Sequence, residues 1–257
     1  MLLPRVMPCL LLQDEELVKT AQFKSPKYVG DPVNVISIFN DLEVDEIVLL
    51  DIGATKRKKK PDFDVIRRVA NECMMPMAYG GGIAELADIQ TVLEIGVEKV
   101  ILNSAAVRNP NLVREAAKVF GSQAIVVSID ARKRLLRRGY EVYTESGSRA
   151  TGRSPVEQAR IAEDLGAGEI LLTSIEREGT MKGYDLDLVA PVCQAVSIPV
   201  IANGGAGARE DLGRPIREAG ASAAAAGALF VFQGPSRGVL INFPERHDLE
   251  RILGVRA

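Results

Sequence analysis

The sequence of 257 residues has no tryptophan and a single histidine, His247, close to the end of the chain. Histidine is the side chain that most often transfers protons in enzymes. An acid–base site in the body of this chain must therefore use carboxylates, lysine, tyrosine or backbone groups. His247 stands between Arg246 and Asp248, and we interpret it as a surface residue rather than a ligand.

The chain also has few cysteines, little net charge and no long apolar run. Its three cysteines are an odd number set far apart, which favours reduced thiols and a cytoplasmic protein over a disulfide framework. No apolar stretch reaches the roughly 18 residues needed to span a bilayer, and we see no signal peptide. The net charge of −2 gives no reason to expect nucleic acid or a membrane surface as a partner.

Short apolar runs alternate with amphipathic stretches along the whole chain. An apolar run bounded by polar residues is typical of a buried strand, and the stretches between the runs have helical spacing. The eight runs are residues 6–12, 47–52, 75–79, 99–102, 124–130, 170–174, 198–202 and 221–226. Eight strands, each followed by a helix, predict one (β/α)8 barrel domain over residues 1–257. A doubly wound sheet is the alternative.

An internal repeat favours the barrel. The segment Asp31-Pro32-Val33 recurs 123 residues later as Ser154-Pro155-Val156, and Glu46-Ile47-Val48 recurs at the same offset as Glu169-Ile170-Leu171. Repeats of this kind indicate stacked copies of one structural unit. We interpret the chain as two fused half-barrels, about residues 1–122 and 123–257.

Glycine clusters follow two repeat-related strands. Gly80-Gly81-Gly82 follows the third predicted strand, and Gly204-Gly205-Ala206-Gly207 follows the seventh. Backbone without side chains can approach a ligand closely, and N–H groups before a helix bind anions. With Asn103-Ser104 after the fourth strand and Gly227 after the eighth, they predict two phosphate sites across the barrel mouth. The alternative is that these glycines only turn tight corners.

Polar residues at the strand ends are the candidates for chemistry. Asp130 ends the fifth predicted strand, where barrel enzymes place catalytic groups, and is a candidate general acid or base. The repeat relates this strand to the first, where a counterpart is expected near Leu11, yet no carboxylate stands there. Asp51 and Ser174 end two other strands, and Glu178 follows in a loop on the same side. For these residues the alternative to a role in the site is capping of a turn or helix.

Two charged groups mark other parts of the predicted barrel. Arg5, Glu46, Lys99 and Glu169 stand just before strands begin, so they can form a ring of salt bridges across the barrel floor. That ring either seals the floor or acts as a gate. The basic run of residues 56–60 follows the second strand on the mouth side. It is either a solvated loop or a site for a diphosphate-bearing ligand.

The residues through about position 210 resemble the cyclase subunit of imidazole glycerol phosphate synthase. The matching motifs include Gly80-Gly81-Gly82-Ile83, Asn103-Ser104-Ala105-Ala106-Val107, Ser128-Ile129-Asp130-Ala131 and Leu171-Leu172-Thr173-Ser174. The resemblance implies a substrate with a phosphate at each end and ammonia that rises through the barrel from a glutaminase subunit docked on the floor. It also implies that Arg5, Glu46, Lys99 and Glu169 gate the ammonia.

The resemblance further implies roles for the mouth residues. Asp130 becomes one catalytic carboxylate and Lys19 a lysine that helps to hold the substrate. The implied phosphate- and substrate-binding set is Asp51, Gly81, Gly82, Asn103, Ser104, Thr173, Glu178, Gly179, Gly204, Gly205 and Gly227. We expect no cofactor and no metal.

The chain departs from the family pattern at its first strand. Cyclases have an aspartate at the position of Leu11, and two carboxylates can divide acid and base roles in a way that one cannot. Gly227 stands where the family often has serine. Residues 23–32 and the segment after residue 230 are similar instead to cyclase-like paralogues associated with glycosyl amidation.

Three functional hypotheses follow. In the paralogue's setting, the barrel passes ammonia to an ATP-dependent amidating enzyme that acts on a nucleotide-linked sugar for surface polysaccharide. The alternative is a genuine cyclase of histidine biosynthesis that tolerates Leu11, with Glu178 or Asp51 as its second carboxylate. A non-catalytic scaffold that only activates the glutaminase is the third.

Overall fold

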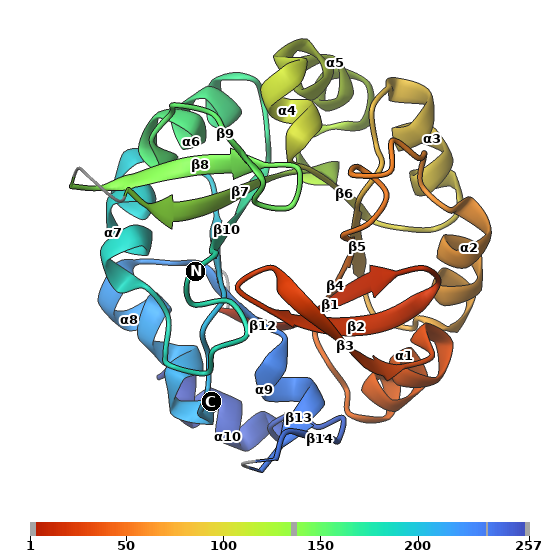
Figure 1. Cartoon of the computed structure of the whole chain (residues 1–257), viewed down its shortest axis with the longest axis vertical. Coiled ribbons are helices and arrows are strands. Elements are labelled where there is room, and N and C mark those ends of the chain that lie inside the picture. The colour runs from red at the N-terminus through yellow and green to blue at the C-terminus, as the bar shows by residue number, and fades with distance from the viewer. Residues whose placement is uncertain (1–3, 135–137, 235, 255–257) are drawn as a thin grey trace.

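The computed structural model describes residues 4–134, 138–234 and 236–254, and they form a closed (β/α)8 barrel, as predicted (Figure 1). Its eight parallel strands are β1 (Arg5–Gln13), β4 (Ile47–Asp51), β5 (Met77–Gly80), β6 (Lys99–Leu102), β7 (Ile125–Lys133), β10 (Glu169–Ser174), β11 (Val200–Asn203) and β12 (Ala223–Ala226). Parallel pairing of β12 with β1, which brings Ala223 beside Arg5, closes the barrel. The doubly wound alternative is therefore wrong.

Helices surround the strands on the outside (Figure 1). They are α1 (Pro32–Asp41), α2 (Phe63–Glu72), α3 (Leu86–Glu94), α4 (Ser104–Arg108), α5 (Pro110–Phe120), α6 (Pro155–Asp164), α7 (Leu186–Ala195), α8 (Arg214–Ala219), α9 (Ala228–Val231) and α10 (Arg246–Leu253), with 3-10 turns at Ser122–Ala124 and Arg209–Gly213. Among the described residues, no helix combines the length and apolar character that a membrane span requires.

Apolar residues fill two layers. Between strands and helices lies the larger core, which includes Phe39, Ile66 and Leu172. Inside the barrel lies a second cluster made by residues of all eight barrel strands: Met7, Cys9, Val48, Ala78, Ile101, Val126, Leu171, Ile201, Ala223 and Ala225. The barrel interior is thus packed with small and branched side chains, as in other barrels of this type.

Two strands of the barrel are followed by hairpins and not directly by helices, which corrects the simple strand–helix alternation. After β1 come β2 (Glu16–Ala21) and β3 (Lys24–Gly30), and after β7 come β8 (Tyr140–Thr144) and β9 (Arg149–Ala150). A last short hairpin, β13 (Phe232–Gln233) and β14 (Gly238–Val239), follows α9. The first two hairpins lie above the carboxyl ends of the barrel strands, over the mouth (Figure 1).

Asp130 therefore does not end its strand. β7 continues to Lys133, and Asp130 pairs with Tyr143 of β8. The residues after Asp130 stay extended because their backbone groups find partners in the hairpin instead of turning into a helix. Asp130 lies where the barrel ends and the hairpin begins.

Candidate active site at the barrel mouth

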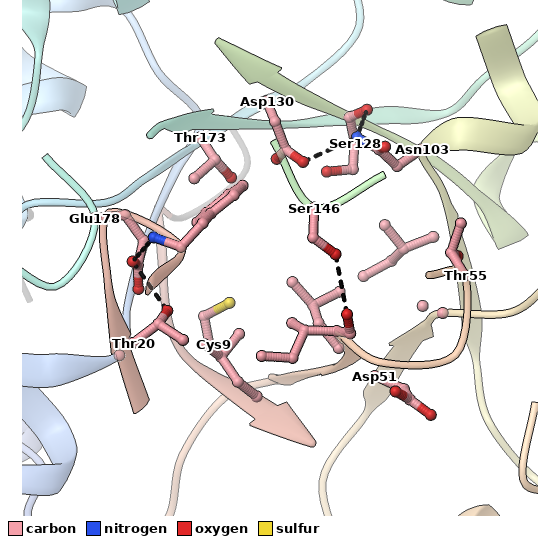
Figure 2. A pocket seen from close by; sticks show the side chains of 18 of the residues that line it. Cys9, Thr20, Asp51, Thr55, Asn103, Ser128, Asp130, Ser146, Thr173 and Glu178 are labelled. Atoms are coloured by element: carbon pink, nitrogen blue, oxygen red, sulfur yellow. Dashed lines mark hydrogen bonds between the residues drawn. The ribbon is translucent and has the colours of Figure 1, made fainter. Parts of the chain in front are cut away.

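A cavity of about 400 Å³ opens at the carboxyl ends of the barrel strands (Figure 2). Its lining includes Leu11 and the whole catalytic and binding set that the resemblance implies for the mouth: Lys19, Asp51, Gly81, Gly82, Asn103, Ser104, Asp130, Thr173, Glu178, Gly179, Gly204, Gly205 and Gly227. Ser174, which the sequence also offered as a site residue, is not part of the lining, and neither is Glu176 of the loop after β10. The Ser174 hydroxyl turns outward instead and donates to Asp185, 3.3 Å away.

Asp130 lies in the wall of this cavity among hydrogen-bond donors. The Asn103 side-chain amide donates to its carboxylate at 3.1 Å, as Figure 2 shows. Burial raises the pKa of Asp130 to about 7, although hydrogen bonds from Thr173, Ser128 and Asn103 oppose the shift. A carboxyl group that titrates near neutral pH can both accept and donate protons there. The geometry thus suits the general acid or base predicted from the sequence.

Asn203 is a site residue that sequence reasoning missed. Its amide donates to Thr173 Oγ1 at 3.1 Å and lies 3.7 Å from the thiol of Cys9. Thr173 in turn contacts Asp130, so Asn203 orients the donor next to the carboxylate. Only the register of β10 with β11, which sets Thr173 beside Asn203, brings this pair together. The sequence signal was its place one residue before a predicted glycine cluster.

Leu11 gives the β1 side of the mouth an apolar wall. The side chain lines the cavity and is only 8% exposed. Leu50, its neighbour on β4 in the barrel register, lines the same wall. No ionisable group therefore comes from the end of β1 at the place where the repeat-related strand carries Asp130.

Lys19 and Glu178 form a buried ion pair beside this wall. Lys19 comes from β2, Glu178 comes from the loop after β10, and the ammonium contacts Glu178 Oε1. Burial lowers the pKa of Lys19 to about 8, and the nearby Arg237 guanidinium lowers it further, while Cys9 opposes the shift. The pair is the only ion pair between two buried side chains in the described segments.

The first predicted phosphate site lies between Gly82, Asn103 and Ser104. The Gly82 amide points at the Thr55 hydroxyl, 3.4 Å away, and the Ser104 hydroxyl donates to Asn103 Oδ1 at 3.2 Å. A β-carbon on Gly82 would meet the Pro61 nitrogen at 2.8 Å, so this glycine also allows close packing of a loop. The geometry is thus compatible with both hypotheses for this glycine cluster, a phosphate site and a tight turn.

The glycines of the second predicted phosphate site are likewise compatible both with a bound anion and with close packing of loops. Gly205 has φ of 118°, and Gly183 donates to its carbonyl at 2.8 Å. A β-carbon on Gly179 would collide with the Thr20 carbonyl of β2, because the first hairpin packs directly on this loop. Asp51 is engaged in a turn, since its Oδ1 accepts from the Gly53 and Ala54 amides at 2.8 and 2.9 Å.

The four charged residues at the opposite end do form a closed ring, as predicted. Arg5 donates to Glu46 at 2.5 Å and to Glu169 at 2.8 Å, and Lys99 donates to the same two carboxylates at 2.7 and 3.2 Å. Each cation therefore bridges both anions. The ring closes the barrel floor beneath the apolar interior cluster, and a gating role stays a prediction.

The basic run of residues 56–60 is divided between surface pairs and the cavity. Arg57 pairs with Asp14 at 2.6 Å, and Lys60 pairs with Glu85. Lys56 lines the cavity. His247 is exposed near Glu245 and Asp248, which confirms it as a surface residue. Among the described residues, no group of three or more metal-ligating side chains comes together.

The ionisation of Asp130 predicts a pH-dependent stability. Because the pKa of Asp130 in the folded protein, about 7, lies above the ordinary aspartate value of 3.8, wild-type stability falls as the pH rises from about 4 to 7. Asp130→Asn removes this loss. We expect the variant to gain about 1–3 kcal/mol relative to wild type between pH 4.5 and pH 8, measured by urea unfolding at both values. If the free energies of unfolding of wild type and Asp130→Asn differ by the same amount at both pH values, the raised pKa of Asp130 is contradicted.

Comparison with known proteins agrees with the geometry. The family model described as histidine biosynthesis protein matches residues 5–235. A Pseudomonas aeruginosa protein with the provisional name imidazole glycerol phosphate synthase subunit hisF2 is 50% identical over 246 residues, 96% of this chain and 98% of the relative. A Leptospira interrogans protein, provisionally named as subunit HisF of the same synthase, is 45% identical over 252 residues, 98% of this chain and 99% of the relative.

A further relative, from Clostridium botulinum, is named imidazole glycerol phosphate synthase subunit HisF without qualification. It is 43% identical over 233 residues, which cover 91% of this chain and 92% of the relative. The resemblance predicted from the mouth and floor motifs is therefore confirmed, and the chain belongs to the histidine biosynthesis protein family as a HisF-like barrel.

Proposed function

We propose that this barrel receives ammonia from a glutaminase subunit and serves in the amidation of a nucleotide-linked sugar for surface polysaccharide. The relatives' names, which describe subunits of a synthase, support a partner chain. The closed ring of Arg5, Glu46, Lys99 and Glu169 is a suitable gate at the floor, because ammonia can pass only when a contact opens. An ATP-dependent amidating enzyme is the third component.

The observation that carries the proposal is Leu11. The mouth contains Asp130 with its three hydrogen-bond donors. The end of β1, which the repeat relates to β7, carries the buried, apolar Leu11 instead of a second carboxylate. A cyclase that divides acid and base work between two carboxylates loses about 10²–10⁴ in rate when one is absent. A barrel whose remaining duty is to deliver ammonia to a different ligand keeps its floor and can lose that carboxylate.

The ligand in this proposal is phosphorylated and held at the mouth. The glycine segments around Gly82 and Gly205 present backbone to the cavity, and Lys56 adds a positive charge at its edge. Phosphate groups are recognised well by such backbone and lysine combinations. The basic loop suits the diphosphate of a nucleotide-linked sugar.

The experiment is turnover of the cyclase substrate by the barrel with its glutaminase partner. We expect glutamine hydrolysis to proceed while little imidazole glycerol phosphate forms, at least about 100-fold less than a two-carboxylate relative produces. Glutaminase activity measured in the same mixture is the control for assembly. Turnover equal to that of such a relative would defeat the proposal.

The second candidate is a genuine cyclase of histidine biosynthesis. It is favoured by the Clostridium botulinum relative, whose name is that of the synthase subunit. In that case the second carboxylate is Glu178 or Asp51, since both line the cavity: Asp51 accepts from two backbone amides, and Glu178 pairs with Lys19. Robust cyclase turnover that is lost in Glu178→Gln would favour this candidate.

A further inference from the structure

Two residues that lie far apart in the sequence, Glu178 and Gly227, adjoin one side chain, Lys19. Lys19 comes from β2, and in the ladder between β1 and β2 its chain neighbour Val18 pairs with Leu11. The approach of Glu178 and Gly227 to one lysine is therefore a property of the fold.

Gly227 provides the space in which the lysine lies. A β-carbon at this position would lie 2.8 Å from Cε and 3.2 Å from Cδ of Lys19. Distances below 3.0 Å are too short for a carbon contact, and the lysine stem is enclosed on all sides, 7% exposed. A side chain at position 227 therefore crowds the stem, and its β-carbon would also lie 2.8 Å from the Cys9 backbone carbonyl.

Glu178 receives the other end of the lysine and uses its two oxygens for different contacts. Oε1 contacts the Lys19 ammonium. Oε2 accepts from the Thr20 hydroxyl at 3.0 Å and from the Phe23 amide at 3.1 Å, and Figure 2 shows the Thr20 bond. One carboxylate thus holds both the lysine and the hairpin that carries it.

A buried ammonium needs a nearby negative charge, and among the described groups that face Lys19 one carboxylate can supply it. The ionisable groups that face Lys19 are the Glu178 carboxylate, the Cys9 thiol and the Arg237 guanidinium. Burial raises the pKa of Cys9 to about 11, so this thiol stays neutral at physiological pH. Arg237 repels the ammonium. Leu11 supplies no charge from β1, which leaves Glu178 as the counter-ion.

We infer that Glu178 is the positioning residue for Lys19 and takes the place of the carboxylate that β1 lacks. Gly227 is part of the same device, since it provides the space for the stem. The inference rests on the proposed function only in that Lys19 serves the ligand at the mouth. The site then presents two ionisable groups to a ligand, Asp130 on β7 and a lysine fixed by Glu178.

The two oxygens of Glu178 allow a selective test. Glu178→Gln keeps an oxygen for Thr20 and Phe23 but places a neutral amide against the ammonium. We expect the pKa of Lys19, followed by the 13Cε chemical shift in lysine-labelled protein and assigned with Lys19→Arg, to fall by at least about one unit. Hydrogen exchange of the Phe23 amide is expected to stay within about threefold of wild type.

Glu178→Ala is expected to lower the pKa of Lys19 and also to speed exchange at Phe23, by about tenfold or more. Gly227→Ser should move the Lys19 13Cε signal, because the serine side chain pushes the stem aside. Glu176→Gln, two residues from Glu178 and outside the cavity lining, is the matched control and is expected to change neither readout.

Leu11→Asp in the Glu178→Gln background gives the sharpest outcome. If positions 11 and 178 can each supply the counter-ion, the added aspartate reverses at least half of the fall in the pKa of Lys19. An unchanged Lys19 titration in Glu178→Gln, or the same change in Glu176→Gln, would overturn the inference. These readouts need only the isolated barrel, so they stand whether or not the proposed ammonia transfer fails.

Discussion

Leu11→Asp is expected to raise the rate of imidazole glycerol phosphate formation by about 100-fold or more when the barrel is paired with its glutaminase. The new carboxylate would stand at the repeat-related position to Asp130, lining the same cavity. Two carboxylates at the mouth can again divide the acid and base roles, and each is worth about 10²–10⁴ in rate. The measurement is product release from the cyclase substrate at saturating glutamine.

Leu11→Asn is the matched control for this gain. Asparagine has nearly the shape of aspartate but no titratable proton, so a gain that depends on proton transfer is absent from it. Leu11 is 8% exposed, and the aspartate also costs stability, which urea unfolding of both variants measures. Equal rates for the aspartate, asparagine and wild-type proteins would mean that Leu11 is not what limits cyclisation.

Arg5→Ala is expected to open the floor ring, with a loss of stability and of ammonia transfer together. Arg5 contacts both carboxylates of the ring, and its removal leaves Lys99 alone between Glu46 and Glu169. Because Glu46 is buried while the Arg5 side chain is 28% exposed, we expect a cost of about 1–3 kcal/mol, below that of a fully buried pair. Water that enters the opened floor also lowers the nitrogen transferred per glutamine hydrolysed.

The control for the floor ring is Arg214→Ala. Arg214 pairs with Glu218 at 3.0 Å, but both side chains are nearly half exposed and lie on one helix turn. Solvent screens such an exposed pair, so it contributes little to stability, and its loss is expected to leave ammonia transfer unchanged. If Arg5→Ala has the same stability and the same ammonia transfer as Arg214→Ala, the ring neither stabilises the floor nor acts as a gate.

Local patterns in the sequence predicted the barrel, its eight strands and the glycines and carboxylates at the strand ends, whereas Lys19 and Thr173 were predicted only through the family resemblance. Buried parallel strands are continuous apolar runs, and the carboxyl ends of such strands meet at one face. The floor ring was predictable for the same reason, since Arg5, Glu46, Lys99 and Glu169 all stand at strand starts.

The missed features depend on contacts between distant segments. The hairpin after β1 was read as a helical unit, because Glu16–Ala21 and Lys24–Gly30 are short and only partly apolar. Asn203 was missed because its role depends on the register with Thr173 on the neighbouring strand. The Lys19–Glu178 pair depends on how the hairpin folds back across the mouth, which no local pattern encodes.

The most direct measurement follows the nitrogen itself. The barrel, its glutaminase and the ATP-dependent amidating enzyme would be supplied with glutamine carrying 15N in its amide and with excess unlabelled ammonium in the medium. The account predicts that the nitrogen added to the sugar by amidation is mostly 15N with the wild-type barrel and approaches the isotope ratio of the medium with Arg5→Ala. A wild-type product with the isotope ratio of the medium would contradict passage of ammonia through the barrel.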